Sequence, residues 1–133
     1  MKVYANSMLN RKITIPQRNK IIKYKFRGKI WKYKGVGGWH FVNLTKSLTE
    51  KIRKTHIHSE EGWGRLKIVA KINNSEWAGA IWFDSKKKIY LLPVKLEIRK
   101  KEHLRIGDSF IVTLKISNTP KAWVPFLGSR DRL

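Results

Sequence analysis

Cysteine is absent from the 133 residues, and acidic residues are scarce and come late. The lack of cysteine excludes a disulfide framework and any metal site or nucleophile that uses a thiolate. No apolar run approaches the roughly 18 residues that a membrane-spanning helix needs, and residues 1–12 lack the apolar core of a signal peptide. We therefore expect a cytoplasmic protein without a membrane span.

Positive charge dominates what is present. The chain has 30 Lys and Arg against 9 Asp and Glu, and no acid precedes Glu50, whereas 12 basic residues do. The formal net charge of +21 attracts nucleic acid, anionic membrane surfaces or acidic proteins. The alternative is a host whose proteins favour Lys, Ile and Asn. With 41% hydrophobic and 11% aromatic residues, we expect one folded domain with its own core.

The stretch 88–116 predicts a strand, a short helix, a turn and a second strand. Residues 89–92 are apolar, and Pro93 fits the first turn of a helix near 94–102, where a missing N–H costs nothing. Gly107 and Asp108 then signal a turn, after which apolar residues alternate at period two. This stretch is informative about fold and says little about chemistry.

An earlier segment, 39–72, repeats this plan at an offset of about 45 residues. After a first strand, Ser47 and Glu50 match a capping box, which predicts a helix near 48–54. Both predicted helices carry two apolar residues four apart followed by Arg-Lys, and both are followed by a glycine turn and an alternating strand. The repeat favours an internal duplication, and two unrelated strand–helix–strand units are the alternative.

A strand near residues 22–30 has one apolar and one cationic face. The alternation shifts at Ile30-Trp31, which predicts a bulge there. Cations on one face of a strand are spaced about 6.6–7 Å apart and could follow phosphates. The alternative is that outward strand positions are usually charged and that edge lysines block aggregation. The candidate polyanion-binding residues are Lys23, Lys25, Arg27, Lys29, Lys32 and Lys34.

Two short motifs favour loops that connect secondary-structure elements over phosphate-binding or metal sites. Residues 34–38 are glycine-rich and predict a hairpin turn, but they lack the Lys and Ser or Thr of a phosphate-binding loop. His56 and His58 are followed by Glu60 and Glu61, a spacing that fits no structural zinc pattern. We expect an exposed polar connection there and no metal site.

The strand at 75–84 is apolar in both phases, which predicts a strand covered on both faces. The apolar segment 123–127 is expected to dock over an open end of the sheet, with a partner motif as the alternative. The residues expected in the core are Ile22, Phe26, Trp39, Phe41, Ile52, Ile68, Trp77, Leu92, Ile98, Val112 and Leu114.

Several of these residues together resemble a known family. The pieces are Phe26, Trp31-Lys-Tyr33, Gly37-Gly-Trp39-His-Phe-Val42, Gly62-Trp-Gly64, Trp77, Tyr90-Leu-Leu-Pro93, Arg99-Lys100 and Gly107-Asp108. They are similar to the small bacterial β-barrel family filed as domain of unknown function nineteen-oh-five. Thr45 stands where that family often has proline.

The resemblance implies a mainly β fold and no established activity. It implies a small closed or double-split, AbrB-like barrel of two similar strand-strand-helix-strand halves, with two short helices. We therefore expect a basic N-terminal arm (1–20), a barrel domain (21–117) and a C-terminal tail packing on the barrel (118–133). Because both halves lie in one chain, a monomer or weak dimer is expected.

The functional expectation is a binding module. The sequence contains no nucleophile elbow, zincin motif or dinucleotide fingerprint, so we expect no enzymatic activity and no cofactor. Nucleic acid or another polyanion is the expected partner of the basic strand. The alternative is a small-ligand- or protein-binding domain with no nucleic-acid role.

Overall fold

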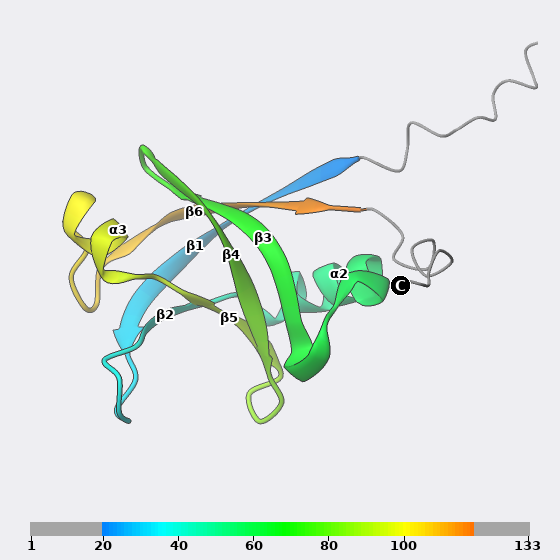
Figure 1. Cartoon of the computed structure of the whole chain (residues 1–133), viewed down its shortest axis with the longest axis horizontal. Helices are drawn as coiled ribbons and strands as arrows, with labels where there is room; N and C mark the ends of the chain where they lie inside the picture. Colours follow the sequence, from blue (N-terminus) through cyan, green and yellow to red (C-terminus); the bar gives the residue numbers. More distant parts are fainter. Residues whose placement is uncertain (1–19, 119–133) are drawn as a thin grey trace, which may run out of the picture.

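The computed structural model describes residues 20–118, which form six strands and two helices (Figure 1). The strands are β1 (Ile21–Lys32), β2 (His40–Asn43), β3 (Arg65–Ile72), β4 (Ser75–Asp84), β5 (Ile89–Pro93) and β6 (Ser109–Ser117). The helices are α2 (Lys46–His56) and α3 (Leu96–Lys101), and two 3-10 turns, Ile57–Ser59 and Gly62–Gly64, connect α2 to β3. The predicted arm before Lys20 and the apolar segment 123–127 lie outside the described residues.

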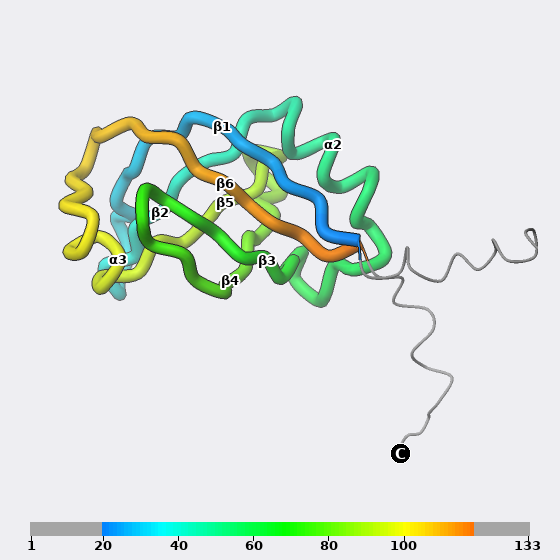
Figure 2. The backbone as a smooth tube through the Cα atoms, turned by 90° about the horizontal axis from the view of Figure 1, so that it is seen from above, coloured from blue at the N-terminus to red at the C-terminus, as the bar shows by residue number. Residues whose placement is uncertain are grey.

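The strands close into one antiparallel barrel in the order β1-β2-β5-β4-β3-β6. β1 closes it, because it pairs with β6 along residues 21–29 and with β2 along residues 30–32. The helices lie at opposite ends of the barrel (Figure 1). The two ends of the described chain lie side by side, where the Asn118 N–H donates to the Lys20 carbonyl at 2.8 Å (Figure 2). The predicted mainly β barrel with two short helices is confirmed, and the double-split type stays a prediction.

The strand order has the two-fold arrangement that a duplication requires. Exchanging β1 with β4, β2 with β5 and β3 with β6 leaves every strand pairing of the barrel unchanged. At the centre of this exchange, β2 pairs antiparallel with β5 and β3 pairs antiparallel with β6. In each half a strand, a helix and a further strand follow one another, as the repeat predicted. The topology therefore supports two halves of common plan.

Apolar side chains from all six strands and both helices fill the barrel. Burial of the predicted core residues Phe26, Ile52, Ile68, Leu92, Ile98, Val112 and Leu114 is confirmed. Ile22 and Trp77 are half-buried and pack against this core. A glycine is needed at position 28, since a Cβ there would lie 2.2 Å from Val42 Cγ1. This close approach brings β1 tightly across β2.

The prediction that Trp39 and Phe41 are buried in the core is wrong. Ile30 pairs with Val42 in register, and both are buried, so Phe41 points to the outer face and is half-buried there. Trp39 precedes β2 and is 53% exposed. Residues 39–44 do alternate between inward and outward positions, but the side chains that point into the barrel are those of Val42 and Leu44.

The prediction that β4 is covered on both faces is also wrong. Ile81 is fully buried inside the barrel, whereas Ala78 and Trp82 lie exposed on the outer face. Ala80, between them on the same face, is buried, so the outer face of β4 is covered only in part. The apolar outer phase of β4 instead borders a groove, which is described below.

Both helices begin at other residues than predicted. Thr45 is the N-cap of α2, and its hydroxyl accepts a 3.1 Å hydrogen bond from the Leu48 N–H, so Ser47 lies inside the helix and forms no capping box. Pro93 does not begin a helix, because it ends β5 opposite Phe41. The next N–H, that of Val94, still donates to the His40 carbonyl at 2.9 Å. Because the hydrogen bonding to β2 continues through Val94, α3 begins only at Leu96.

His56 is buried, although the sequence predicted an exposed connection at 55–62. It lies 1% exposed at the end of α2, and its Nε2 is 2.9 Å from the Tyr24 hydroxyl. Within residues 20–118, no hydrogen-bond partner reaches its Nδ1. His58 is exposed, so the two histidines do not face a common site. Burial lowers the pKa of His56 below its ordinary value.

This burial predicts a loss of stability under mildly acidic conditions. Because the pKa of His56 is lower in the folded chain, the unfolded chain takes up the proton first as the pH falls below about 6.5. The free energy of unfolding should therefore fall between about pH 7 and pH 5. Urea unfolding at several pH values measures it, and His56→Phe should flatten this dependence. His58→Phe is the matched control, and an equal flattening there would contradict the assignment.

Candidate functional site

The outer face of β1 carries four cations in one line. Lys23, Lys25, Arg27 and Lys29 are all exposed, while Tyr24, Phe26, Gly28 and Ile30 between them are buried. Strand geometry spaces the four at about 6.6–7 Å. None of them forms an ion pair with a carboxylate of residues 20–118. We call these four residues the basic line.

Further cations lie beside the basic line on the neighbouring strands. Lys115 of β6 lies opposite Lys23 in register, and its Nζ is 2.9 Å from Glu76 Oε2. The hydrogen bond and charge of Lys115, with the charges of Lys71 and Lys23, lower the pKa of Glu76. One carboxylate thus faces three lysines, and the positive potential at this end of the sheet persists.

Lys32 and Lys34 do not extend the basic line. β1 pairs with β2 residue by residue through Ile30, Trp31 and Lys32, so the predicted bulge is absent and the alternation continues. The outward position after Lys29 is therefore Trp31. Lys32 and Lys34 are exposed at the end of β1 and in the turn that follows. The structure brings four of the six predicted residues together and places the other two at the turn.

Aromatic side chains gather on the outer face where the basic line ends. The Trp31 and Phe41 ring centroids are 5.3 Å apart. Trp39 stacks on Phe41 at 6.0 Å with an interplanar angle of 7°, and Tyr33 meets Phe41 edge-on at 6.3 Å. The positive φ angles of Gly37 and Gly38 turn the chain so that Trp39 returns onto this face. Sequence reasoning missed this cluster.

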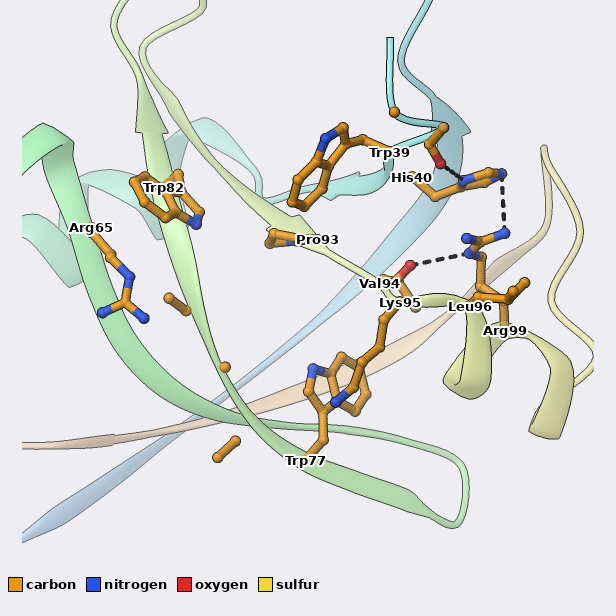
Figure 3. A pocket seen from close by; sticks show the side chains of 15 residues that line it. Trp39, His40, Arg65, Trp77, Trp82, Pro93, Val94, Lys95, Leu96 and Arg99 are labelled. Atoms are coloured by element: carbon orange, nitrogen blue, oxygen red, sulfur yellow. Dashed lines mark hydrogen bonds between the residues drawn. The ribbon is translucent and has the colours of Figure 1, made fainter.

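A groove runs from these rings across β5 to β4. Its apolar part has a volume of about 360 Å³ and is lined by Tyr33, Trp39, Phe41, Trp82, Leu91 and Pro93. An adjoining hollow of about 450 Å³ shares Trp39, Trp82 and Pro93 with it and reaches Trp77, His40 and Arg99 (Figure 3). We call the two together the aromatic groove. No carboxylate of residues 20–118 lines either part.

Arg99 is held at one end of the aromatic groove (Figure 3). Its Nε donates to the Val94 carbonyl at 3.1 Å, and its Nη1 lies 3.4 Å from His40 Nε2. Because a guanidinium only donates, His40 Nε2 accepts, and His40 Nδ1 carries the proton that it donates to the Gly38 carbonyl at 2.8 Å. No carboxylate of the described residues forms an ion pair with Arg99.

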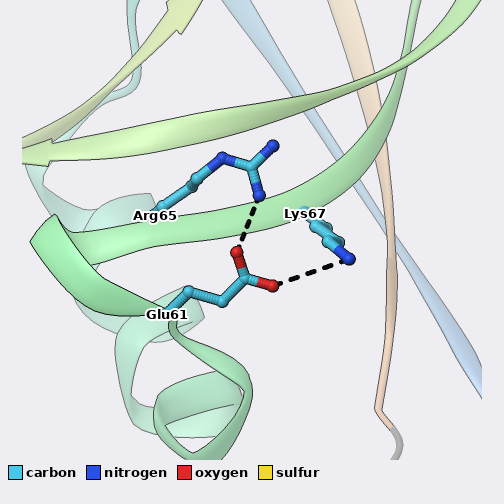
Figure 4. A network of polar contacts seen from close by, with 3 residues as sticks. All are labelled: Glu61, Arg65 and Lys67. Carbon is cyan, nitrogen blue, oxygen red and sulfur yellow. Dashed lines mark hydrogen bonds and ion pairs between the residues drawn. The ribbon is translucent and has the colours of Figure 1, made fainter.

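The positive charge of Arg65, near the other end of the groove, is balanced by a carboxylate. Its Nη1 donates to Glu61 Oε1 at 2.7 Å, and Glu61 Oε2 also lies 3.7 Å from Lys67 Nζ (Figure 4). The guanidinium carbon lies 5.6 Å from the centroid of the Trp82 ring. Arg65 can thus support a ring–cation contact, and Arg99 is the better donor for an incoming anion.

No three His, Cys, Asp or Glu side chains within residues 20–118 gather in a way that would hold a metal ion. No helix in this part of the chain has the length and hydropathy of a membrane span. The basic line and the aromatic groove present aromatic ring faces, guanidinium groups and ammonium groups.

Comparison with known proteins places the chain in a family. The family described as "Domain of unknown function (DUF1905)" matches residues 26–114. The chain belongs to this family. The match covers the barrel from the middle of β1 to the middle of β6 and confirms the family that the sequence resembles. No curated protein matches the chain.

Proposed function

We propose that this member of the DUF1905 family is a non-enzymatic module that binds nucleic acid through the outer face of β1. The observation that supports it is the basic line, four exposed cations at regular spacing with no ion-paired acid among the described residues. Cations on one surface add their potentials, and the net charge of +21 attracts a polyanion from a distance. Contacts of this kind read phosphates and carry no sequence information.

A protein- or small-ligand-binding role is the second candidate. The aromatic groove favours it, because exposed apolar hollows on a barrel exterior often mark partner sites. The closed barrel has both halves in one chain, which supports a monomer and a double-split origin of the fold. The two candidates differ in salt dependence, since an apolar contact releases few counterions.

The salt dependence of binding tests the proposal. Neutralising four phosphates of a duplex should give a log–log slope of association constant against salt of about −3.6. Fluorescence anisotropy of a labelled 20-base-pair duplex, titrated at salt concentrations from about 50 to 200 mM, measures this slope. Two duplexes of different sequence should bind alike. A chain with no affinity at the lowest salt for these duplexes or for their separated strands would overturn the proposal and leave the second candidate.

A further inference from the structure

We infer that the nucleic acid is single-stranded and that its unpaired bases stack in the aromatic groove. This inference rests on the proposed function and names its substrate class. A base inside a duplex is covered by its neighbours, whereas an unpaired base offers both faces to a protein ring. A site built of phosphate contacts that lead into exposed aromatic rings suits the second kind of substrate.

The basic line and the aromatic groove are continuous. Trp31 occupies the outward position of β1 after Lys29, so the same strand face passes from cations to a ring. From Trp31 the rings follow each other to Phe41 at 5.3 Å and then to Trp39 at 6.0 Å. Trp39 borders both parts of the groove. A strand whose phosphates follow β1 therefore reaches the groove with its next nucleotides.

The rings of the groove have free surface for stacking. Trp39 is 53% exposed, Tyr33 is 47% exposed and Trp82 is 37% exposed. The Trp39 ring lies nearly parallel to Phe41, a contact that orients it while about half of its surface stays exposed. Large apolar side chains gathered in the open are costly for a monomer unless a partner uses them. These three rings are the stacking platform of the proposal.

Charge in the groove selects an anionic occupant. Lys87 Nζ lies 4.4 Å from the Trp31 ring centroid, and Arg65 lies over Trp82. Arg99 faces the groove without an ion-paired carboxylate among residues 20–118. Cations interleaved with rings are the combination that holds a single strand, because the phosphates and the bases are bound together. A neutral peptide or a sugar would leave the charge of Arg99 unused.

The first test compares ligands that differ in whether they offer unpaired bases for stacking. A 15-nucleotide oligothymidylate, an abasic strand of equal length and a hairpin duplex are titrated into the full chain at one salt concentration. The oligothymidylate should bind at least fivefold more tightly than the abasic strand, as expected for one stacked base, and should quench tryptophan fluorescence. Equal affinity for the abasic strand would overturn the inference and leave the proposed function standing. Absence of binding to all three would overturn both.

The second test removes one ring. Trp39→Ala should weaken oligothymidylate binding by about 5- to 150-fold, the range expected for one stacked base, and leave binding of the abasic strand unchanged. Trp39→Phe keeps a ring and should restore most of the affinity. Trp63→Ala is the matched control, because Trp63 is 90% exposed and lies outside the groove. Thermal unfolding curves of the variants should overlay. Equal losses in Trp39→Ala and Trp63→Ala would overturn the inference.

Discussion

Reversing two charges in the middle of the basic line is expected to abolish most of the binding to duplex DNA. In Lys25→Glu/Arg27→Glu, two of the four phosphate contacts are lost, so the salt slope should fall from about −3.6 to about −1.8. This loss corresponds to a weakening of about 200-fold at 50 mM salt and about 20-fold at 200 mM. Both side chains are exposed, so the fold should be unaffected. Fluorescence anisotropy at both salt concentrations measures the change.

A control variant separates the effect of the position of these charges from the effect of their number. Lys51→Glu/Lys54→Glu changes two exposed lysines of α2 and alters the net charge by the same amount. If the basic line is the contact, this control should keep the steep slope and lose only the small long-range part of the affinity. Equal losses in the two variants would mean that binding follows net charge alone, and the proposed site would be wrong.

Three strands of this protein, β1, β3 and β6, are readable from its sequence because each has a clear period. Tyr24, Phe26 and Ile30 face the core, and the cations between them face outward, as the alternation predicted. β3 and β6 obey the same rule, and the glycine turns fall where the pattern breaks. Local alternation is sufficient here because one face of each strand in a closed barrel points into the apolar interior and the other points to solvent.

The aromatic groove could not be predicted from the same rules. A strand pattern gives the alternation but not which phase is inside, and the prediction placed Trp39 and Phe41 in the inward phase. Only the pairing of Val42 with Ile30 decides the phase of β2. A signal was present in β4, whose outer phase is apolar at Ala78, Ala80 and Trp82. An apolar second phase indicates either cover or a binding surface, and the sequence does not distinguish them.

Interior packing explains why function should lie on the outside of this barrel. A barrel of six strands is filled by its own side chains, and here Val42, Leu92 and Leu114 are completely buried. The two helices lie at its two ends (Figure 1). The exterior of the six strands is the surface that remains, and the part formed by β1, β2, β5 and β4 carries both the basic line and the aromatic groove.

Phe26→Ala is expected to have the largest effect on stability. Phe26 lies 7% exposed inside the barrel, opposite Val112 in register, and its ring edge lies 3.2 Å from where a Cβ of Gly28 would stand. The ring therefore occupies space that the glycine leaves free. Its removal leaves a cavity in a closed barrel that cannot collapse easily, so the free energy of unfolding should fall by about 3–5 kcal/mol. Urea unfolding followed by tryptophan fluorescence measures the loss.

A neighbouring variant separates packing from any general sensitivity of β1. Lys25→Ala truncates an exposed side chain one position away, and surface changes of this kind usually shift stability by less than about 0.5 kcal/mol. The contrast between the two positions tests the strand phase on which the basic line depends, since a buried Phe26 requires Lys25 and Arg27 to face outward. A loss below about 1 kcal/mol in Phe26→Ala, well under the range for buried aromatic residues, would show that this phase is misassigned. Lys25 and Arg27 would then not face outward, and the loss of binding expected for Lys25→Glu/Arg27→Glu would not be observed.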